Sequence, residues 1–267
     1  MVATVRIARY TAGEESPAYG IVGGDDGEEI IAELAGDPLH QPIALTGNQM
    51  RLSEVRLLAP VLPRSKVVGI GRNYADHARE MGGDVPDEPL MFLVPNTAVI
   101  GPDDPVVMPS TSREIHYEGE LAVVIGRFCK DVPAARAADV IYGYTCANDV
   151  TARDLQRLDG QWARAKGMDT FCPLGPWIET VLDVSALSIV TRRDGEVVQD
   201  GTTADMVHKV ADLVAYVSQA FSLLPGDVIL TGTPAGVGPV EAGQRVEVEI
   251  EGIGTLANPF VRRDPLP

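Results

Sequence analysis

Apolar residues alternate with polar ones, or form short unbroken runs, over most of the chain, and these segments end at glycines, prolines or polar turns. Alternation with a period of two predicts strands with one buried face, and short apolar runs predict strands buried on both faces. We expect strands at residues 4–8, 18–22, 29–32, 66–71, 90–94, 114–125, 140–147, 188–191, 197–199, 227–233, 245–250 and 254–261. The pattern therefore predicts a mainly β protein with short helices.

Helical periodicity is confined to a few segments. Apolar residues repeat at helical spacing over 210–221, which predicts an amphipathic helix packed on the core. Shorter helices are expected at 73–81, around 134–138 and from residue 151, and Asn73 can cap the first of them. These helices connect strands and add little to the predicted core.

Two prolines mark the ends of residues 60–63, which is typical of a domain boundary. The 267 residues suffice for one large or two small domains. We therefore expect a small N-terminal β module over residues 1–60 and a larger domain over residues 61–267.

The chain is acidic, with 22 Lys and Arg against 38 Asp and Glu and a net charge of -16. This charge disfavours nucleic acid and anionic membrane surfaces as partners. No segment has the apolar length of a membrane span, and the first residues lack the pattern of a signal peptide. We expect a soluble, cytoplasmic protein, which can still bind a small anion where a metal and a few cations reverse the local field.

The three cysteines, Cys129, Cys146 and Cys172, are widely spaced and form neither a C-x-x-C pair nor a Cys/His cluster suited to zinc. Isolated cysteines of this kind are typical of buried thiols in a reducing compartment. We expect no disulfide and no zinc site.

An acidic face stands out in the expected strand 114–125, where Glu114, His116, Glu118 and Glu120 point to the same side. Two residues of strand rise separate the Cα atoms of Glu118 and Glu120 by about 6.6 Å. A solvated face of an edge strand would explain such a pair. The apolar run that follows instead places the acids at the mouth of a core, where like charges need a cation.

Asp149 follows the expected strand 140–147 at the edge where loops build sites. It could add a third carboxylate to Glu118 and Glu120, or it could serve only to cap the helix that follows. A hard divalent cation is the ligand that such a set of carboxylates would suit.

His77 and Glu80 lie three residues apart on the expected helix 73–81 and share a face. Glu80 could orient the imidazole and make it a better base, or the two could form an ordinary surface pair. The glycine-containing loop 82–89 that follows is typical of a lid. The Gly-rich turn before the helix lacks the third glycine of a dinucleotide fingerprint, which argues against a nicotinamide site.

The segment 227–238 is a strand followed by a tight polar loop without the lysine of a phosphate-binding P-loop. Its backbone amides and the hydroxyls of Thr231 and Thr233 could hold a small carboxylate. Lys166 stands in another loop-like segment, where pattern alone suggests a solvated side chain.

Four ordered motifs together resemble the fumarylacetoacetate hydrolase family: Gly71-Arg-Asn-Tyr-Ala-Asp-His77, Tyr117-Glu-Gly-Glu-Leu-Ala-Val-Val-Ile-Gly126, Asn148-Asp-Val-Thr-Ala-Arg-Asp154 and Leu230-Thr-Gly-Thr-Pro-Ala-Gly-Val-Gly238. The resemblance covers about residue 60 to the C-terminus, and the first 60 residues resemble the small extension of bacterial members. It implies a mixed β-sandwich roll, usually a homodimer, with a divalent metal, Mg²⁺ or Mn²⁺, in its mouth.

The resemblance also implies roles for individual residues. The metal ligands would be Glu118, Glu120 and Asp149, with water completing the shell. His77 and Glu80 would form the catalytic base pair on the lid, and Lys166 would be the active-site lysine. Four residues would line the substrate pocket: Arg72, Arg153, Gln156 and Thr233.

The activity implied is hydrolysis of a carbon-carbon bond in acylpyruvate- or fumarylpyruvate-type 2-oxo acids, through an enolate stabilised by the metal. The substrate would be a small anionic 2-oxo acid. The same site could serve a 2-hydroxyhepta-2,4-diene-1,7-dioate isomerase or an oxaloacetate decarboxylase of aromatic-acid catabolism. The His77 and Glu80 pair favours hydrolysis because an isomerase needs no activated water. A metal-bound protein that binds such acids without turnover is an alternative of another class.

Overall fold

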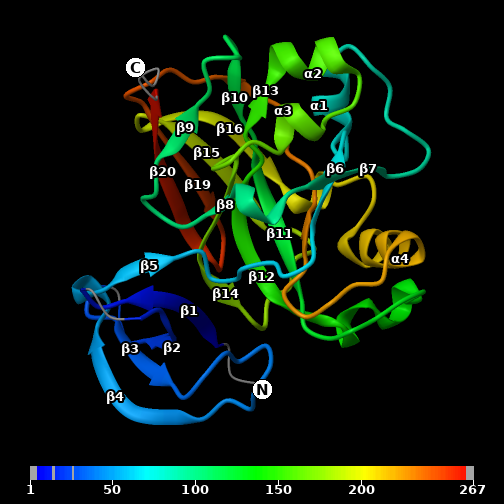
Figure 1. Cartoon of the computed structure of the whole chain (residues 1–267). Helices are drawn as coiled ribbons and strands as arrows, with labels where there is room; N and C mark the ends of the chain where they lie inside the picture. The colour runs from blue at the N-terminus through cyan, green and yellow to red at the C-terminus, as the bar shows by residue number, and fades with distance from the viewer. Residues whose placement is uncertain (1–4, 14–15, 26, 263–267) are drawn as a thin grey trace.

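The structure is a computed structural model that describes residues 5–13, 16–25 and 27–262 (Figure 1). Residues 1–4 lie outside these ranges. They include the first residue of the strand expected at 4–8 and most of the segment considered for a signal peptide. The described residues form mainly strands with a few short helices, so the expected fold class is confirmed.

Twelve strands form the largest sheet, in the order β4-β3-β2-β1-β14-β12-β11-β17-β6-β7, with β5 beside β1 and β8 beside β14. Their bounds are β1 Arg6–Thr11, β2 Ala18–Gly23, β3 Ile30–Leu34, β4 Leu45–Arg51, β5 Arg56–Leu58, β6 Val67–Gly71, β7 Leu90–Val94, β8 Val99–Ile100, β11 Gly119–Ile125, β12 Ile141–Asn148, β14 Cys172–Glu179 and β17 Val228–Leu230. The N-terminal strands join this sheet through antiparallel pairing of β1 with β14.

Two smaller sheets complete the β structure of the described residues. A five-stranded sheet has the order β16-β15-β19-β20-β9, and a three-stranded sheet has the order β13-β10-β18. Their bounds are β9 Val106–Met108, β10 Ile115–Tyr117, β13 Thr151–Ala152, β15 Ser188–Arg193, β16 Glu196–Thr202, β18 Gly238–Pro239, β19 Arg245–Ile250 and β20 Gly254–Arg262.

Helices are short and lie around the sheets (Figure 1). The α-helices are α1 Ala75–Glu80, α2 Arg153–Asp159, α3 Ala163–Lys166 and α4 Val210–Ala220, and the 3₁₀ helices are Leu52–Glu54, Asn96–Ala98, Ala134–Asp139 and Thr203–Asp205. The amphipathic helix expected over 210–221 is confirmed as α4, whose apolar face packs on the core. The helix expected around 134–138 is a 3₁₀ helix.

Strand β11 runs through the centre of the molecule, and all seven of its residues are buried. Leu121 and Val123 pack into the cluster shared with the five-stranded sheet and α4, while Ala122 and Val124 pack into the cluster on the opposite face. A strand covered on both faces needs apolar side chains at every position. The unbroken apolar run in the sequence therefore reflects burial on both faces of the strand, as expected.

The single strand expected over 114–125 is wrong in one respect. The chain leaves the three-stranded sheet after Tyr117 and enters the large sheet at Gly119, with Glu118 between β10 and β11. Glu114 lies near the surface and pairs with Arg157 instead of facing the core. The alternating pattern continued across two strands that belong to different sheets.

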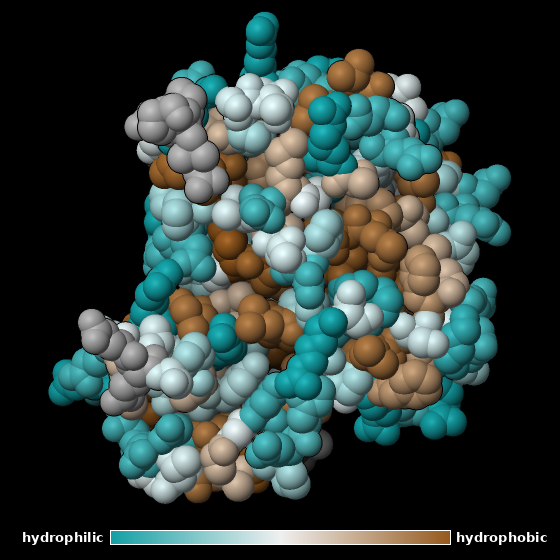
Figure 2. Space-filling model, viewed as in Figure 1, coloured by the Kyte–Doolittle hydropathy of each residue, from teal (hydrophilic) through white to brown (hydrophobic). Residues whose placement is uncertain are grey.

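Two further expectations were wrong. Tyr74, not Asn73, is the N-cap of α1, and the Asn73 side chain donates to the carbonyls of His208 (3.0 Å) and Thr231 (2.8 Å). Strand β7 is not fully buried, because Leu90 and Leu93 are 38% and 48% exposed. Figure 2 shows apolar side chains gathered on the face where β7 and α3 lie in Figure 1.

The three cysteines are free and buried, as expected. Among the described residues, no helix is long and apolar enough to span a membrane.

Candidate active site

The carboxylates of Glu118, Glu120 and Asp149 meet where β10, β11 and β12 end or begin. One carboxylate oxygen of each lies within 4.8 Å of the other two, and all three residues are buried. Two hydrogen bonds fix this arrangement: the Asp149 N–H donates to the Glu118 carbonyl, and the Glu118 N–H donates to the side-chain oxygen Oδ1 of Asn148, both at 2.9 Å. The structure thus brings together the three acids expected from the sequence.

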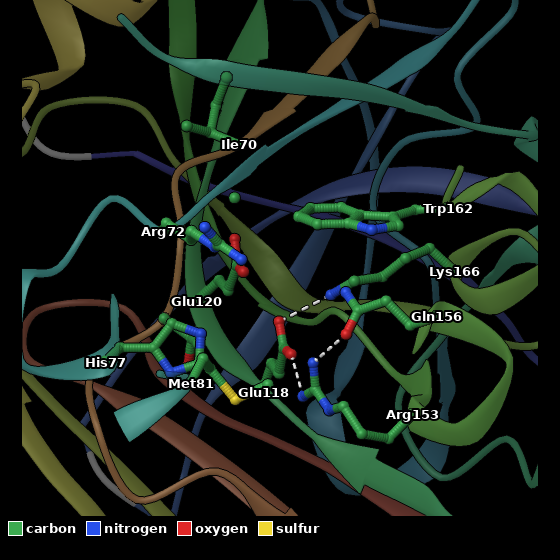
Figure 3. A pocket seen from close by; sticks show the side chains of 12 residues that line it. Ile70, Arg72, His77, Met81, Glu118, Glu120, Arg153, Gln156, Trp162 and Lys166 are labelled. Atoms are coloured by element: carbon green, nitrogen blue, oxygen red, sulfur yellow. Dashed lines mark hydrogen bonds and ion pairs between the residues drawn. The ribbon is translucent and has the colours of Figure 1, made fainter. Parts of the chain in front are cut away.

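Two buried cations face these acids. The Lys166 ammonium lies 2.7 Å from Glu118 Oε2 and 2.6 Å from Asp149 Oδ2. Arg153 donates to the other oxygen of Glu118 and, at 2.6 Å, to Gln156 Oε1 (Figure 3). Pattern alone suggested a solvated Lys166, but α3 carries this lysine into the interior, where it is 2% exposed.

The surroundings separate the proton affinities of the three acids. Burial alone would raise the pKa of Glu118, but Lys166 and Arg153 hold it well below its usual range. Burial raises the pKa of Asp149 to about 6, despite the opposing effect of Lys166. Burial, Asp149 and Glu118 raise the pKa of Glu120 well above its usual value. Three carboxylates therefore share too little positive charge to be ionised together.

This donor set fits a hard divalent cation. Carboxylate oxygens are the ligands that Mg²⁺ and Mn²⁺ prefer. Asp149 Oδ1 is buried and has no hydrogen-bond partner among the described residues, although such atoms are normally paired. A cation bound by Glu118, Glu120 and Asp149 would pair this oxygen and supply the missing charge.

His77 and Glu80 lie on α1 beside the acids. Their side chains approach to 3.5 Å, between His77 Nδ1 and Glu80 Oε2, so they share a helix face as expected. The Glu80 carboxylate also accepts a hydrogen bond from the Gly236 N–H at 3.1 Å. Burial lowers the pKa of His77, while the Glu118 charge and the hydrogen bond that His77 donates to Glu80 oppose this change. A lowered pKa favours the neutral imidazole, which is the form that can accept a proton.

One pocket collects most of these side chains (Figure 3). Its lining includes eight residues expected from the sequence, which are Arg72, His77, Glu118, Glu120, Arg153, Gln156, Lys166 and Thr233. Asp149 and Glu80 are outside this lining, but each bonds to a residue within it. The apolar wall of the pocket, formed by Ile70, Met81 and Trp162, was not expected from the sequence.

The expected role of the two threonine hydroxyls needs correction. Thr231 Oγ1 donates to the Leu121 carbonyl at 2.9 Å, and Thr233 Oγ1 donates to the Gly119 carbonyl at 2.8 Å. A hydroxyl has a single proton, so neither can donate to a ligand without leaving a buried carbonyl unpaired. Thr233 still lines the pocket, but its hydroxyl is not a free donor.

Arg72 has a left-handed backbone with φ of 57°, which is uncommon for a residue with a side chain. Its guanidinium packs on the loop that follows α1, since a Cβ at Gly83 would lie only 2.8 Å from Arg72 Nη1. The strained backbone thus places a cation between the acidic cluster and the loop expected to act as a lid.

Comparison with known proteins extends this picture. The family model described as fumarylacetoacetate (FAA) hydrolase C-terminal matches residues 66–261, and the model described as Rv2993c-like, N-terminal matches residues 5–60. Protein Rv2993c of Mycobacterium tuberculosis is 53% identical over 97% of this chain and 99% of its own. Human mitochondrial oxaloacetate tautomerase FAHD2A is 48% identical over 78% of this chain and 70% of its own.

Solved structures with the same fold carry several activities in their names. A 5-carboxymethyl-2-hydroxymuconate delta-isomerase from Mycobacterium smegmatis is 51% identical, with a TM-score of 0.90 over 97% of this chain and 100% of that one. Maleylpyruvate hydrolase from Sphingobium, in complex with manganese(II) and pyruvate, is 32% identical, with a TM-score of 0.80 over 97% and 100%. Fumarylpyruvate hydrolase from Pseudomonas aeruginosa, with Mn²⁺ and pyruvate, is 36% identical, with a TM-score of 0.72 over 78% and 92%.

The acidic cluster, the His77 and Glu80 pair, and the match over residues 66–261 agree with one another. The chain belongs to the fumarylacetoacetate hydrolase family.

Proposed function

We propose that this protein is a divalent-metal-dependent enzyme that hydrolyses the carbon-carbon bond of acylpyruvate- or fumarylpyruvate-type 2-oxo acids. The observation that carries the proposal is the buried, paired His77 in the same pocket as the carboxylates of Glu118 and Glu120. The two hydrolases with bound manganese and pyruvate support it, because they share the fold of this chain.

Glu118, Glu120 and Asp149 would hold the ion, which is Mg²⁺ or Mn²⁺. When bound, it supplies positive charge for the carboxylate and the 2-oxygen of the substrate. Lys166 and Arg72, which line the same pocket, would add positive charge around the anionic substrate. The pocket then gives an anionic 2-oxo acid an electrostatically favourable position inside an acidic protein.

Neutral His77 would take a proton from water as the water oxygen adds to the second carbonyl carbon of the substrate. Collapse of this adduct breaks the bond between that carbon and its neighbour, and the electron pair passes to the pyruvate fragment. The acyl fragment leaves as a carboxylate, and a proton transferred to carbon gives pyruvate. Glu80 would keep the His77 ring oriented throughout, and Lys166 would neutralise charge on the departing fragment.

An isomerase or tautomerase is the second candidate. Relatives with these names are 51% and 48% identical to this chain, which is closer than either hydrolase. Proton movement between carbons of a 2-oxo acid requires the same ion and the same base but no attacking water. The presence of Glu80 beside His77 favours hydrolysis without deciding the reaction.

Pyruvate release tests the proposal. The protein is stripped with EDTA and assayed with acetylpyruvate, fumarylpyruvate and oxaloacetate, with and without Mg²⁺ or Mn²⁺. Metal-dependent release from the first two is the expected result, and release from oxaloacetate alone would indicate a decarboxylase. If none yields pyruvate, enol-to-oxo conversion followed by ultraviolet absorbance tests the tautomerase. Binding without any turnover would favour a metal-bound binding protein.

The homodimer expected from the family resemblance stays a prediction. Light scattering on the protein as it elutes from a size-exclusion column measures the mass of the assembly directly.

A further inference from the structure

Gln199, a buried residue outside the pocket, contacts both segments that surround the acidic cluster. It lies on β16 of the five-stranded sheet and is 2% exposed. Its Oε1 accepts a hydrogen bond from the Gly119 N–H at 3.0 Å. Its Nε2 donates to Thr233 Oγ1 at 2.8 Å and to the Pro234 carbonyl at 2.9 Å. One amide thus connects the backbone between Glu118 and Glu120 to the polar loop after β17.

Gly119 depends on these contacts because β17 is short. Strands β11 and β17 pair from Ala122 with Leu230 onward. Beyond that pair, the Thr231 N–H donates to the Leu121 carbonyl at 3.1 Å. β17 ends at Leu230, so the polar groups of Gly119 on this side extend beyond it. The Gln199 side chain accepts from the Gly119 N–H, and Thr233 Oγ1 donates to the Gly119 carbonyl at 2.8 Å. Two side chains therefore continue the ladder past the end of the strand.

The packing around Gly119 leaves no room for adjustment. A Cβ at this position would lie 2.1 Å from Thr191 Oγ1 on β15, so the β15–β16 hairpin rests directly on the Gly119 backbone. Both donors of the Gln199 amide are engaged, and a flipped amide would place an N–H group against the Gly119 N–H. The orientation of Gln199 is therefore fixed by its partners.

The loop after β17 also contacts the acidic cluster directly. The Gly232 N–H donates to Glu120 Oε2 at 2.7 Å, and Gly232 immediately precedes Thr233. A rotation of the Gly119 peptide would move the side chains of both Glu118 and Glu120. A shift of the loop would move a hydrogen bond on the Glu120 carboxylate.

We propose that Gln199 is a positioning residue, which holds the carboxylates of Glu118 and Glu120 at the spacing a divalent ion requires without touching ion or substrate. This inference rests on the metal site of the proposed function. Residues that orient metal ligands typically change metal affinity by 10–100-fold when they are mutated. Gln199 acts one step further out, through the backbone that connects two ligands.

Calorimetric titration of the EDTA-treated full chain with Mn²⁺ tests the proposal. Gln199→Met keeps the length of the side chain and removes its hydrogen bonds, and we expect Mn²⁺ affinity to fall about tenfold or more. Gln199→Asn retains the amide on a shorter side chain and is the milder change if Gln199→Met does not fold. We expect it to lower the affinity to an intermediate level.

Ser218→Ala is the matched control for a lost buried hydrogen bond. Ser218 lies on α4, is fully buried and accepts from the Val132 N–H at 2.8 Å. Its variant should lose stability with Mn²⁺ affinity unchanged, as judged by thermal denaturation and titration together. A purely structural role of Gln199 predicts the same outcome for Gln199→Met.

A double-mutant cycle with Thr233→Val adds a second measurement. Both changes break the same contact, so the double variant should lose less Mn²⁺ affinity than the two single losses combined. If the Gln199 variants bind Mn²⁺ with an affinity within twofold of that of Ser218→Ala, the positioning role is overturned and the proposed function stands. Failure of the unmodified protein to bind any divalent ion would overturn both.

Discussion

The ammonium group of Lys166 lies 2.6 Å from the Oδ2 atom of Asp149, and both side chains are only 3% exposed. The same ammonium contacts Glu118, so one lysine compensates two of the three buried carboxylates. Glu120 instead receives the backbone N–H of Gly232. Buried cations thus compensate only part of the charge of the cluster, and the three carboxylates could still bind a further cation.

Replacing Lys166 with methionine should destabilise the metal-free protein by about 3–5 kcal/mol, because it leaves buried carboxylates without their partner. Urea unfolding of EDTA-treated protein measures this change. Arg164→Met removes an exposed arginine from the same short helix and should leave the free energy of unfolding nearly unchanged. Equal changes for the two variants would contradict the structural role assigned to Lys166.

Divalent ions should raise the thermal stability of the protein, since they bind the folded cluster and have no such site in the unfolded chain. At an Mn²⁺ concentration of 100 times the dissociation constant, the expected gain is about 2.7 kcal/mol. Thermal denaturation at increasing Mn²⁺ measures it. Asp149→Asn should abolish most of the gain, whereas Asp154→Asn on the adjacent helix should preserve it. An unchanged response of Asp149→Asn would remove Asp149 from the ligand set.

Replacing His77 with alanine should abolish most hydrolysis while sparing metal affinity. Loss of a general base typically slows a reaction by about 10²–10⁴-fold. Steady-state kinetics and Mn²⁺ titration on the same preparation separate the two effects. Arg79→Ala, an exposed position on the same helix, should leave both measurements unchanged. Equal loss of activity and affinity in His77→Ala would show that His77 supports the metal site and is not the base.

The buried pair of Lys66 and Asp227 should matter more to stability than any exposed pair. Asp227 is fully buried and accepts from Lys66 Nζ at 2.7 Å and from the Leu224 N–H at 2.9 Å. Asp227→Ala removes the acceptor of the Lys66 and Leu224 backbone N–H groups and leaves Lys66 Nζ with only the Ser65 hydroxyl and the Ser222 carbonyl. We expect a loss of about 3 kcal/mol or more. Asp139→Ala breaks an exposed pair with Arg136 and is the control for urea unfolding. A loss no larger than that of the control would show that solvent replaces the Asp227 contacts.

Much of this site could be predicted because its acids interrupt strong strand patterns. Glu118 and Glu120 precede an apolar run, and Asp149 follows one, so each position is marked by its neighbours along the chain. The spacing of His77 and Glu80 places them on one helix face whatever the rest of the fold. Local rules sufficed for these residues, while the roles of Lys166 and the pocket residues came from the family resemblance.

Other features depend on contacts between distant segments. The central strand β14 was missed because Pro173 and Pro176 are unusual within a sheet. Gln199 has no local signature, since its importance comes from Gly119, which is 80 residues away in sequence. Asn73 resembles an ordinary helix cap, but its amide joins α1 to two distant loops. Period and propensity describe single elements and do not determine such pairings.

The pH dependence of hydrolysis should report the unusual state of His77. Burial lowers the pKa of His77 below its ordinary value of 6.5, and Arg153 and Lys166 reinforce the effect. The Glu118 charge and the hydrogen bond that His77 donates to Glu80 oppose it. The base must be neutral, so activity is lost as the pH falls through this lowered pKa. The acid limb of kcat/KM against pH should therefore lie below pH 6.5.

Glu80→Gln sharpens this prediction. Loss of the Glu80 charge removes an interaction that favours protonated His77, so the pKa should fall further and the acid limb should move to lower pH. Asp76→Asn removes an exposed charge from the same helix and should leave the limb in place. A shift of the limb to higher pH in Glu80→Gln, or a limb above pH 6.5 in the unmodified protein, would assign the titration to a group other than His77.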